Sequence, residues 1–233
     1  MKKFLVYGAA AGAMAVCGMA SAQLLLPPKG NLAIYGSYMK QTDDPLGLNP
    51  DGFGSGVQLG LNLTRHFFID GSYQYDYLNE DNAPSGSLGL PPGGQASYGL
   101  KIGQGRAGGG LVFHVPLTPL DVFGKIDYTH LDYQYVHATV NGVPFGNSDR
   151  VNDDGQGYHV GVQARVPGLS VYGSVGYLNL SKSEGPEFNV GLELPVAPFT
   201  WGFVEYRYDN LHDNGYFVRD QLNDVRAGVR LAF

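Results

Sequence analysis

The chain has 233 residues and a net charge of −6, with 35 glycines and 16 tyrosines but one cysteine and one tryptophan. The acidic balance argues against a nucleic-acid partner, because binding to phosphates depends on clustered Lys and Arg. With Cys17 alone, the chain cannot build a disulfide framework of its own. After residue 22, no segment approaches the roughly 18 consecutive apolar residues that a transmembrane helix requires.

The first 22 residues have the layout of a secretory signal peptide. Two lysines follow the first Met, residues 4–19 form an apolar run, and residues 20–22 (Ala-Ser-Ala) are small enough for cleavage. We therefore expect residues 1–22 to direct export and residues 23–233 to form a single domain.

From residue 31 to the end, apolar and polar residues alternate in short runs, which is the period of β-strands. Long polar loops are expected at residues 42–51, 79–96 and 136–154, and short connections or tight turns separate the other runs, for example at residues 182–186. The expected strands cover residues 31–39, 57–63, 67–77, a Gly-rich run ending at 113, 122–129, 158–165, 171–177, 188–194, 202–209 and 224–233.

The last run, residues 224–233, has two opposed faces. Val225, Val229 and Leu231 lie on an apolar face, and the other face carries an acid and two arginines. A charged face turned inward and an apolar face turned outward is the inverse of a soluble core and suits a transmembrane barrel. In lipid, only helices and closed barrels form hydrogen bonds with every backbone N–H and C=O group of the spanning segment.

Five hairpins of this kind predict an all-β fold, a transmembrane antiparallel up-and-down β-barrel of ten strands. Eight strands is the alternative if the hairpin at residues 169–194 is misassigned. A soluble periplasmic β-sandwich is a further alternative, but it would leave long apolar rows exposed to water.

Tyrosines gather toward the ends of strands that lead into long loops. Tyr suits a lipid–water boundary because its ring is apolar and its hydroxyl needs water. We therefore expect an aromatic girdle. Its members would be Tyr73, Tyr75, Tyr77, Tyr128, Tyr177, Tyr206 and Tyr208.

The inward rows of the barrel would carry charge of both signs. Barrels of about eight strands have interiors that side chains fill, whereas open channels have about sixteen, so ten strands favours a filled or very narrow lumen over a conducting pore. The predicted lumen-facing residues are Asp70, Asp76, Arg106, Lys125, Asp127, Arg165, Glu193, Glu205, Arg207, Arg226 and Arg230.

Together these features resemble the small outer-membrane β-barrel proteins of diderm bacteria. The turn patterns VPLTPLDVFGKIDY and LPVAPFTWGFVEYRY are also similar to those of YfaZ-type barrels. The resemblance implies a location in the outer membrane after export, contact with outer-membrane lipids, and recognition of the terminal Phe233 by the barrel-assembly machinery. It does not imply a transported solute or an oligomeric state.

Two further sequence patterns look like ligand-binding motifs but do not meet the requirements of such sites. Gly103, Gly105 and Gly108 match the spacing of a dinucleotide-binding motif. Such a site needs a helix after the glycines, and the glycines that follow and Pro116 disfavour a helix here. The acidic pairs in the expected loops miss the EF-hand spacing and are interpreted as solvated charge, so we expect no cofactor and no metal. These pairs are Asp43–Asp44, Glu80–Asp81 and Asp153–Asp154.

A surface hydrolase is a possible alternative function, because some outer-membrane proteases and deacylases place His with Asp or Ser near the outer rim. No Ser stands at His-x-Ser spacing, and the sequence identifies no nucleophile with an oriented base, so we expect no catalysis. The candidate groups are Asp127, His130 and Asp132, and Asp209, His212 and Asp213. The sequence therefore predicts a structural or narrow pore-like membrane barrel, with a small-solute porin as the main alternative.

Overall fold

The computed structural model describes residues 29–42, 49–84, 95–141, 143–144, 150–213 and 219–233. These residues form ten long antiparallel strands that close into a barrel, together with one two-residue strand. The predicted fold class is confirmed, with ten strands and not eight. No helix in this part of the chain is long and apolar enough to cross a membrane. The predicted signal peptide and residues 23–28 lie outside the described residues.

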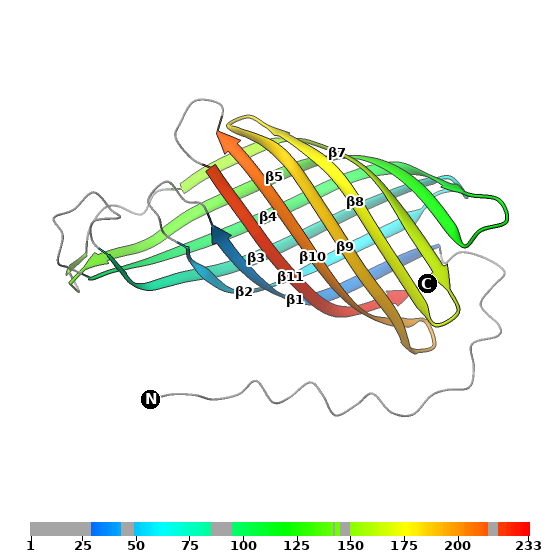
Figure 1. The fold of residues 1–233 in the computed structure, drawn as a ribbon, viewed down its shortest axis with the longest axis horizontal. Helices are drawn as coiled ribbons and strands as arrows, with labels where there is room; N and C mark the ends of the chain where they lie inside the picture. Colours follow the sequence, from blue (N-terminus) through cyan, green and yellow to red (C-terminus); the bar gives the residue numbers. More distant parts are fainter. Residues whose placement is uncertain (1–28, 43–48, 85–94, 142, 145–149, 214–218) are drawn as a thin grey trace.

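The strands tilt around a common axis and follow one another around the wall (Figure 1). Pairing of the first strand with the last closes the barrel, with Asn31 opposite Ala232, and so each long strand has two neighbours. The strands are β1 (Gly30–Thr42), β2 (Asp51–Asn62), β3 (Phe67–Pro84), β4 (Gln95–His114), β5 (Leu120–Val140), β6 (Val143–Pro144), β7 (Arg150–Val166), β8 (Leu169–Leu180), β9 (Ser183–Ala197), β10 (Thr200–Asp213) and β11 (Arg219–Ala232).

The alternation of side chains follows the inverse pattern that the sequence predicts. In β11, Val225 and Val229 point outward and are 42% and 47% exposed, whereas Asp224 and Arg226, on either side of Val225, are 1% and 9% exposed. The same arrangement, apolar outside and polar inside, recurs on the other strands. A wall of this kind presents its hydrocarbon surface to lipid and its charges to the interior.

Several strands run further than the sequence predicts. The expected loop at residues 79–96 is strand up to Pro84 and again from Gln95, and β5 and β7 likewise take residues from both ends of the expected loop at 136–154. β9 begins at Ser183, inside the expected loop at 182–186. Pairing continues because ladder hydrogen bonds join main-chain groups, which polar residues and glycines supply as well as apolar ones.

The two ends of the barrel differ in their connections. We call the end with the long connections the loop end and the end with the tight turns the turn end. Pro167 and Gly168 turn the chain between β7 and β8, and Gly168 has a φ of 78°, as the third position of a type II turn requires. The run that contains Gly103, Gly105 and Gly108 lies within β4, in accord with the absence of a nucleotide-binding helix there.

Candidate functional site: the barrel interior

A salt bridge crosses the interior between strands that are not neighbours. Arg106 on β4 reaches Glu187 on β9, with 2.6 Å between Nη2 and Oε2, although β5, β7 and β8 separate these strands along one side of the wall. Only 7% and 4% of the two side chains are exposed. The two charged groups are therefore in contact as an ion pair, but the angles at these two atoms do not meet those of a hydrogen bond. At this level the two walls are therefore joined by side chains.

Charged groups continue from this bridge on the side of β7, β5 and β3. Glu187 lies 3.7 Å from Nδ1 of His159, whose Nε2 is 3.2 Å from Asp127. Lys125 follows, with its Nζ 3.0 Å from Asp127 and 2.7 Å from Asp70. Each carboxylate in this run therefore has a cation or an imidazole beside it, as buried charges require.

A second run of charges continues through β10 and β11. Asp209 lies 3.8 Å from the guanidinium of the cross-barrel arginine and 3.5 Å from Arg207. Arg207 contacts Asp224 at 3.3 Å, and Arg226 joins Asp224 at 2.8 Å to Glu205 at 2.9 Å. Charges of opposite sign thus alternate in this second run, whereas in the first run an imidazole stands between Glu187 and Asp127.

Neutral donors also contact two of the buried carboxylates. Gln74 donates from Nε2 to Asp76 at 2.8 Å and to Asp224 at 3.0 Å, so the amide joins two acids that would otherwise repel each other. Ser37 donates to the other oxygen of Asp76 at 2.6 Å. All four side chains are buried, and their hydrogen bonds offset the loss of hydration.

Toward the turn end, the two arginines of the last strand lie over aromatic rings. Arg226 stands 5.3 Å from the ring centre of Tyr35, and Arg230 stands 5.1 Å from that of Phe203. Arg230 also pairs with Glu193. A guanidinium that stacks on a ring and binds a carboxylate can be buried at a smaller cost than a bare charge.

Toward the loop end, the interior changes from charged to apolar. Two clusters of buried side chains fill it, and Tyr133 packs against both. We call these residues the apolar layer. The first cluster is Met39, Leu78, Tyr98, Leu100, Ile102 and Leu222, and the second is Leu131, Leu178, Leu180 and Leu211.

The structure places the predicted lumen-facing residues on the inner face of the wall. Most are buried, including Asp76, Asp127, Glu193, Glu205 and Arg207. Arg165 differs, because 57% of its side chain is exposed at the rim of the turn end, where it lies 3.3 Å from Asp121.

Sequence reasoning missed several members of the network, chiefly Glu187, His159 and Asp209. Glu187 immediately precedes the outward Phe188, so strict alternation assigns it to the interior once the strand expected at residues 188–194 is extended by one residue. Asp209 shares the parity of Arg207 on β10. The inward leucines of the apolar layer carry no such signal, because a polar-inside pattern predicts the opposite.

The candidate groups for a surface hydrolase are divided between the two faces of the wall. Asp127 is buried inside the barrel, whereas His130 and Asp132 belong to the outward row of the same strand. His130 instead contacts Asp154, with 2.5 Å between Nδ1 and Oδ1. In the second group, Asp209 is buried inside and His212 is exposed on the outer face, and the side chain of Asp213 lies outside the described residues.

The expected loop acids are also placed differently. Asp153 is 3% exposed and accepts hydrogen bonds from Oγ of Ser181 and Ser183 and from the backbone N–H of Lys182, so it holds the β8–β9 turn and is not solvated. Glu80 accepts the backbone N–H of Asn49. Asp43, Asp44 and the side chain of Asp81 lie outside the described residues. No group of three or more acidic, His or Cys side chains in the described part of the chain could hold a metal ion.

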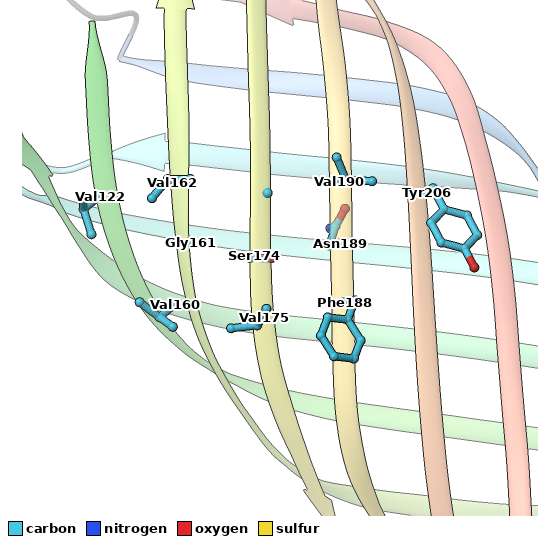
Figure 2. A pocket seen from close by; sticks show the side chains of 11 residues that line it. Val122, Val160, Gly161, Val162, Ser174, Val175, Phe188, Asn189, Val190 and Tyr206 are labelled. Carbon is cyan, nitrogen blue, oxygen red and sulfur yellow. The ribbon is translucent and has the colours of Figure 1, made fainter. Parts of the chain in front are cut away.

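The outer face is apolar in its middle and carries the tyrosines nearer the loop end. A shallow apolar hollow of about 560 Å³ lies among the apolar residues of this face. It is formed mainly by valines such as Val122, Val160 and Val190 and by Phe188 (Figure 2). Because β3 and β5 continue well past their tyrosines, these rings lie partway along the strands and not at their ends. Of the predicted girdle, Tyr73, Tyr75, Tyr128, Tyr177 and Tyr206 are exposed, and Tyr77 and Tyr208 are partly buried.

The network predicts a large effect of removing one central cation. Arg226→Met removes the guanidinium that lies 2.8 Å from Asp224 and 2.9 Å from Glu205, so we expect the free energy of unfolding to fall by roughly 3–5 kcal/mol. Urea unfolding of the protein refolded in lipid vesicles measures this change. Arg165→Met is the matched control, and it should cost much less because that guanidinium is largely solvated. Equal losses for the two variants would contradict the network's role in stability.

Comparison with known proteins agrees with this architecture. A comparison with curated proteins found no match. Among solved structures, the translocator domain of autotransporter NalP from Neisseria meningitidis is 10% identical, with 88% of this chain and 89% of that chain covered and a TM-score of 0.55. The outer membrane protease OmpT from Escherichia coli is 10% identical over 92% and 100% of the two chains, with a TM-score of 0.50. The beta domain of the Bordetella autotransporter BrkA is 14% identical over 88% and 100%, also with a TM-score of 0.50.

At these identities the similar structures show the fold alone. The narrower resemblance to YfaZ-type barrels stays a prediction. The family model described as outer membrane protein beta-barrel domain matches residues 8–233, which is nearly the whole chain. The chain therefore belongs to the outer membrane protein beta-barrel domain family.

Proposed function

We propose that the protein is a structural barrel of the bacterial outer membrane whose interior does not conduct solutes. The observation that carries this proposal is the salt bridge between Arg106 and Glu187, which joins opposite parts of the wall. A path along the axis would have to pass this bridge and then the apolar layer. An ion would lose its hydration at the apolar layer without gaining a polar partner, which is costly.

The size of the barrel supports the same proposal. Ten strands give an interior close to that of eight-stranded barrels, whose lumens side chains fill. The long side chains of Arg106 and Arg207 occupy this space, and both are buried. The proposal includes no catalysis, because the wall separates Asp127 from His130 and Asp209 from His212.

A narrow channel is the second candidate. It is favoured by the two runs of charged groups, which line the interior from Asp70 to Glu205 and could exchange partners with a passing ion. The two candidates differ at the loop end, where the channel requires the apolar layer to open.

Conductance in planar bilayers tests the choice. The refolded protein should stay silent, because the bridge and the apolar layer both obstruct the axis. A variant that removes the bridge and truncates two leucines of the apolar layer, Arg106→Ala and Glu187→Ala with Leu131→Ala and Leu178→Ala, should give discrete steps. Removing the two charges together avoids a lone buried charge.

The control for that experiment carries the same number of outward substitutions, such as Val160→Ala and Val175→Ala with Val190→Ala and Val204→Ala. It should remain folded, as heat-modifiable gel migration reports, and silent. Discrete steps from the unaltered protein would overturn the proposal and favour the channel.

We also propose that Phe233 is the signal for the barrel-assembly machinery, which would act after export. Its side chain is 59% exposed at the end of the outward row, while its backbone is paired with Gly30. Phe233→Ala should therefore lower the amount of folded barrel in cells but leave refolding into vesicles in vitro almost unchanged, as gel migration measures. An equal loss in both settings would mean that Phe233 stabilises the fold and is not read as a signal.

A further inference from the structure

A histidine is held inside the lumen between two carboxylates. His159 on β7 has 6% of its side chain exposed, and each of its ring nitrogens faces an acid. Nε2 lies 3.2 Å from Asp127 on β5, and Nδ1 lies 3.7 Å from Glu187 on β9. β7 and β9 are not neighbours, because β8 lies between them. The imidazole therefore reaches across one strand to join the acids of two others.

Two glycines make room for this ring, and we call the space that they leave the histidine seat. Gly176 on β8 stands directly between His159 and Glu187 in the register of the three strands. A Cβ added at Gly176 would overlap Nδ1 of the ring, and one at Gly157 would lie 2.6 Å from Nε2 and 2.5 Å from Asp127. A side chain at either position would therefore displace the imidazole from its acids.

Each of the two carboxylates also has a permanent cation beside it. Lys125 lies 3.0 Å from Oδ2 of Asp127, and Arg106 lies 2.6 Å from Oε2 of Glu187. A cation at such a distance favours the ionised form of a carboxylate. The oxygen that each acid presents to His159 can therefore accept a proton from the ring but has none to donate.

The charge of the imidazole decides how many of these contacts it can make. Imidazolium has an N–H group at both ring nitrogens and so can face two carboxylates at once. Neutral imidazole has one N–H group, and its other nitrogen presents a lone pair to a carboxylate. That contact is repulsive, and the repulsion is little screened in an interior with few water molecules. Loss of one proton therefore breaks the contact of His159 with either Asp127 or Glu187.

The acids around the ring outnumber the permanent cations. Asp70, Asp127 and Glu187 are the carboxylates of this run, and they share Lys125 and Arg106. A proton on the imidazole makes the two signs equal in number, and its loss leaves one negative charge in excess. The charged groups next to the ring or one contact away are Asp127 and Lys125 on β5, Asp70 on β3, Glu187 on β9, Arg106 on β4, and Asp209 and Arg207 on β10.

Water at the turn end is the nearest source of this proton. Phe123 lies between the ring and that end and is partly exposed, and 17% of the side chain of Lys125 is exposed. On the other side of the ring, Leu131 and Leu178 of the apolar layer are 1% and 0% exposed. His159 therefore exchanges its proton with the solution at the turn end.

We propose that His159 is a proton-operated latch of the interior. With its proton bound, it ties Asp127 to Glu187, and through Glu187 to the salt bridge that crosses the lumen. When it releases the proton to water, one of the two ties is lost. The barrel is therefore held more firmly in mildly acidic solution, and the latch loosens as the pH rises. The inference concerns how firmly the interior is held and not whether it conducts, so it and the proposed function can fail separately.

Urea unfolding of the protein refolded in lipid vesicles tests the latch when it is repeated at two pH values. These are about pH 5.5 and about pH 8.5, on either side of the range in which histidines in proteins commonly titrate. His159→Gln keeps a polar side chain that takes up no proton, so its midpoint urea concentration should lie below that of the unaltered protein at the lower pH. The difference should shrink about twofold or more at the higher pH, because a contact that needs a bound proton is lost with it.

The control for that comparison is His212→Gln, at an exposed position, which should match the unaltered protein at both pH values. An equal loss in His159→Gln at both pH values would mean that His159 only fills space. A larger loss at the higher pH would mean that the neutral ring makes the better contacts. Either result overturns the proposal.

NMR of isotope-labelled histidine in detergent micelles reads the proton directly. The signal of His159 is the one missing from His159→Gln, and it should show both ring nitrogens protonated at about pH 5.5 and one of them at about pH 8.5. A ring with the same protonation at both pH values would contradict a latch.

Gly176→Ala tests the histidine seat without changing a charge. Its methyl group would overlap Nδ1 of His159 and lie 2.9 Å from the backbone oxygen of Tyr158, so the ring should move away from Glu187. Gly173→Ala is the matched control, because Gly173 is an outward glycine of the same strand and a Cβ there would lie 3.6 Å from the nearest atom. The pH-dependent part of the stability should be lost in Gly176→Ala and kept in the control. Its survival in Gly176→Ala would show that the seat is not needed and would overturn the latch.

Discussion

The pairing of Arg106 with Glu187 across the interior is the contact on which the rest of the lumen depends. A barrel of this size encloses too little space for water to hydrate many charges, so each buried charge needs a partner on another strand. The bridge supplies the first pair, and the runs toward Asp70 and Glu205 follow from it as acid and base alternate. Such networks add little net stability compared with an apolar core, but they penalise any arrangement that leaves one member unpaired.

The walls and the interior are organised by one physical requirement. Lipid demands that every backbone group be paired, which closes the sheet, and it accepts only apolar side chains on the outer face. The interior is then free to be polar, and here it is polar in the middle and apolar at the loop end. The apolar layer shows that a membrane barrel can also build a small conventional hydrophobic core, with Leu78, Leu131 and Leu178 fully or almost fully buried.

The fold could be predicted from the sequence because alternation in strands such as residues 224–233 assigns each side chain to a face. The ends of the strands could not be predicted in this way, because β3 and β5 continue by main-chain pairing through polar residues that are typical of loops. For the same reason the strand expected at residues 188–194 does not include Glu187, which β9 contains. Which inward residues meet depends on the stagger between strands around the barrel, and no local pattern reports that β4 and β9 face each other. His130 and Asp127 show why closeness in sequence does not define a site in a strand, since their separation of three residues puts them on opposite faces of β5.

Thiol labelling of the interior tests most directly whether side chains close the lumen. Ser37→Cys, in a Cys17→Ser background, places a thiol beside Asp76, on the turn-end side of the apolar layer, in a position that is 5% exposed. Asn79→Cys, at an exposed position near the loop end, serves as the reference. A membrane-impermeant maleimide added from the loop-end side should label Asn79→Cys readily and leave Ser37→Cys unlabelled until the barrel is unfolded. Labelling of both thiols at similar rates in the folded protein would contradict a closed lumen.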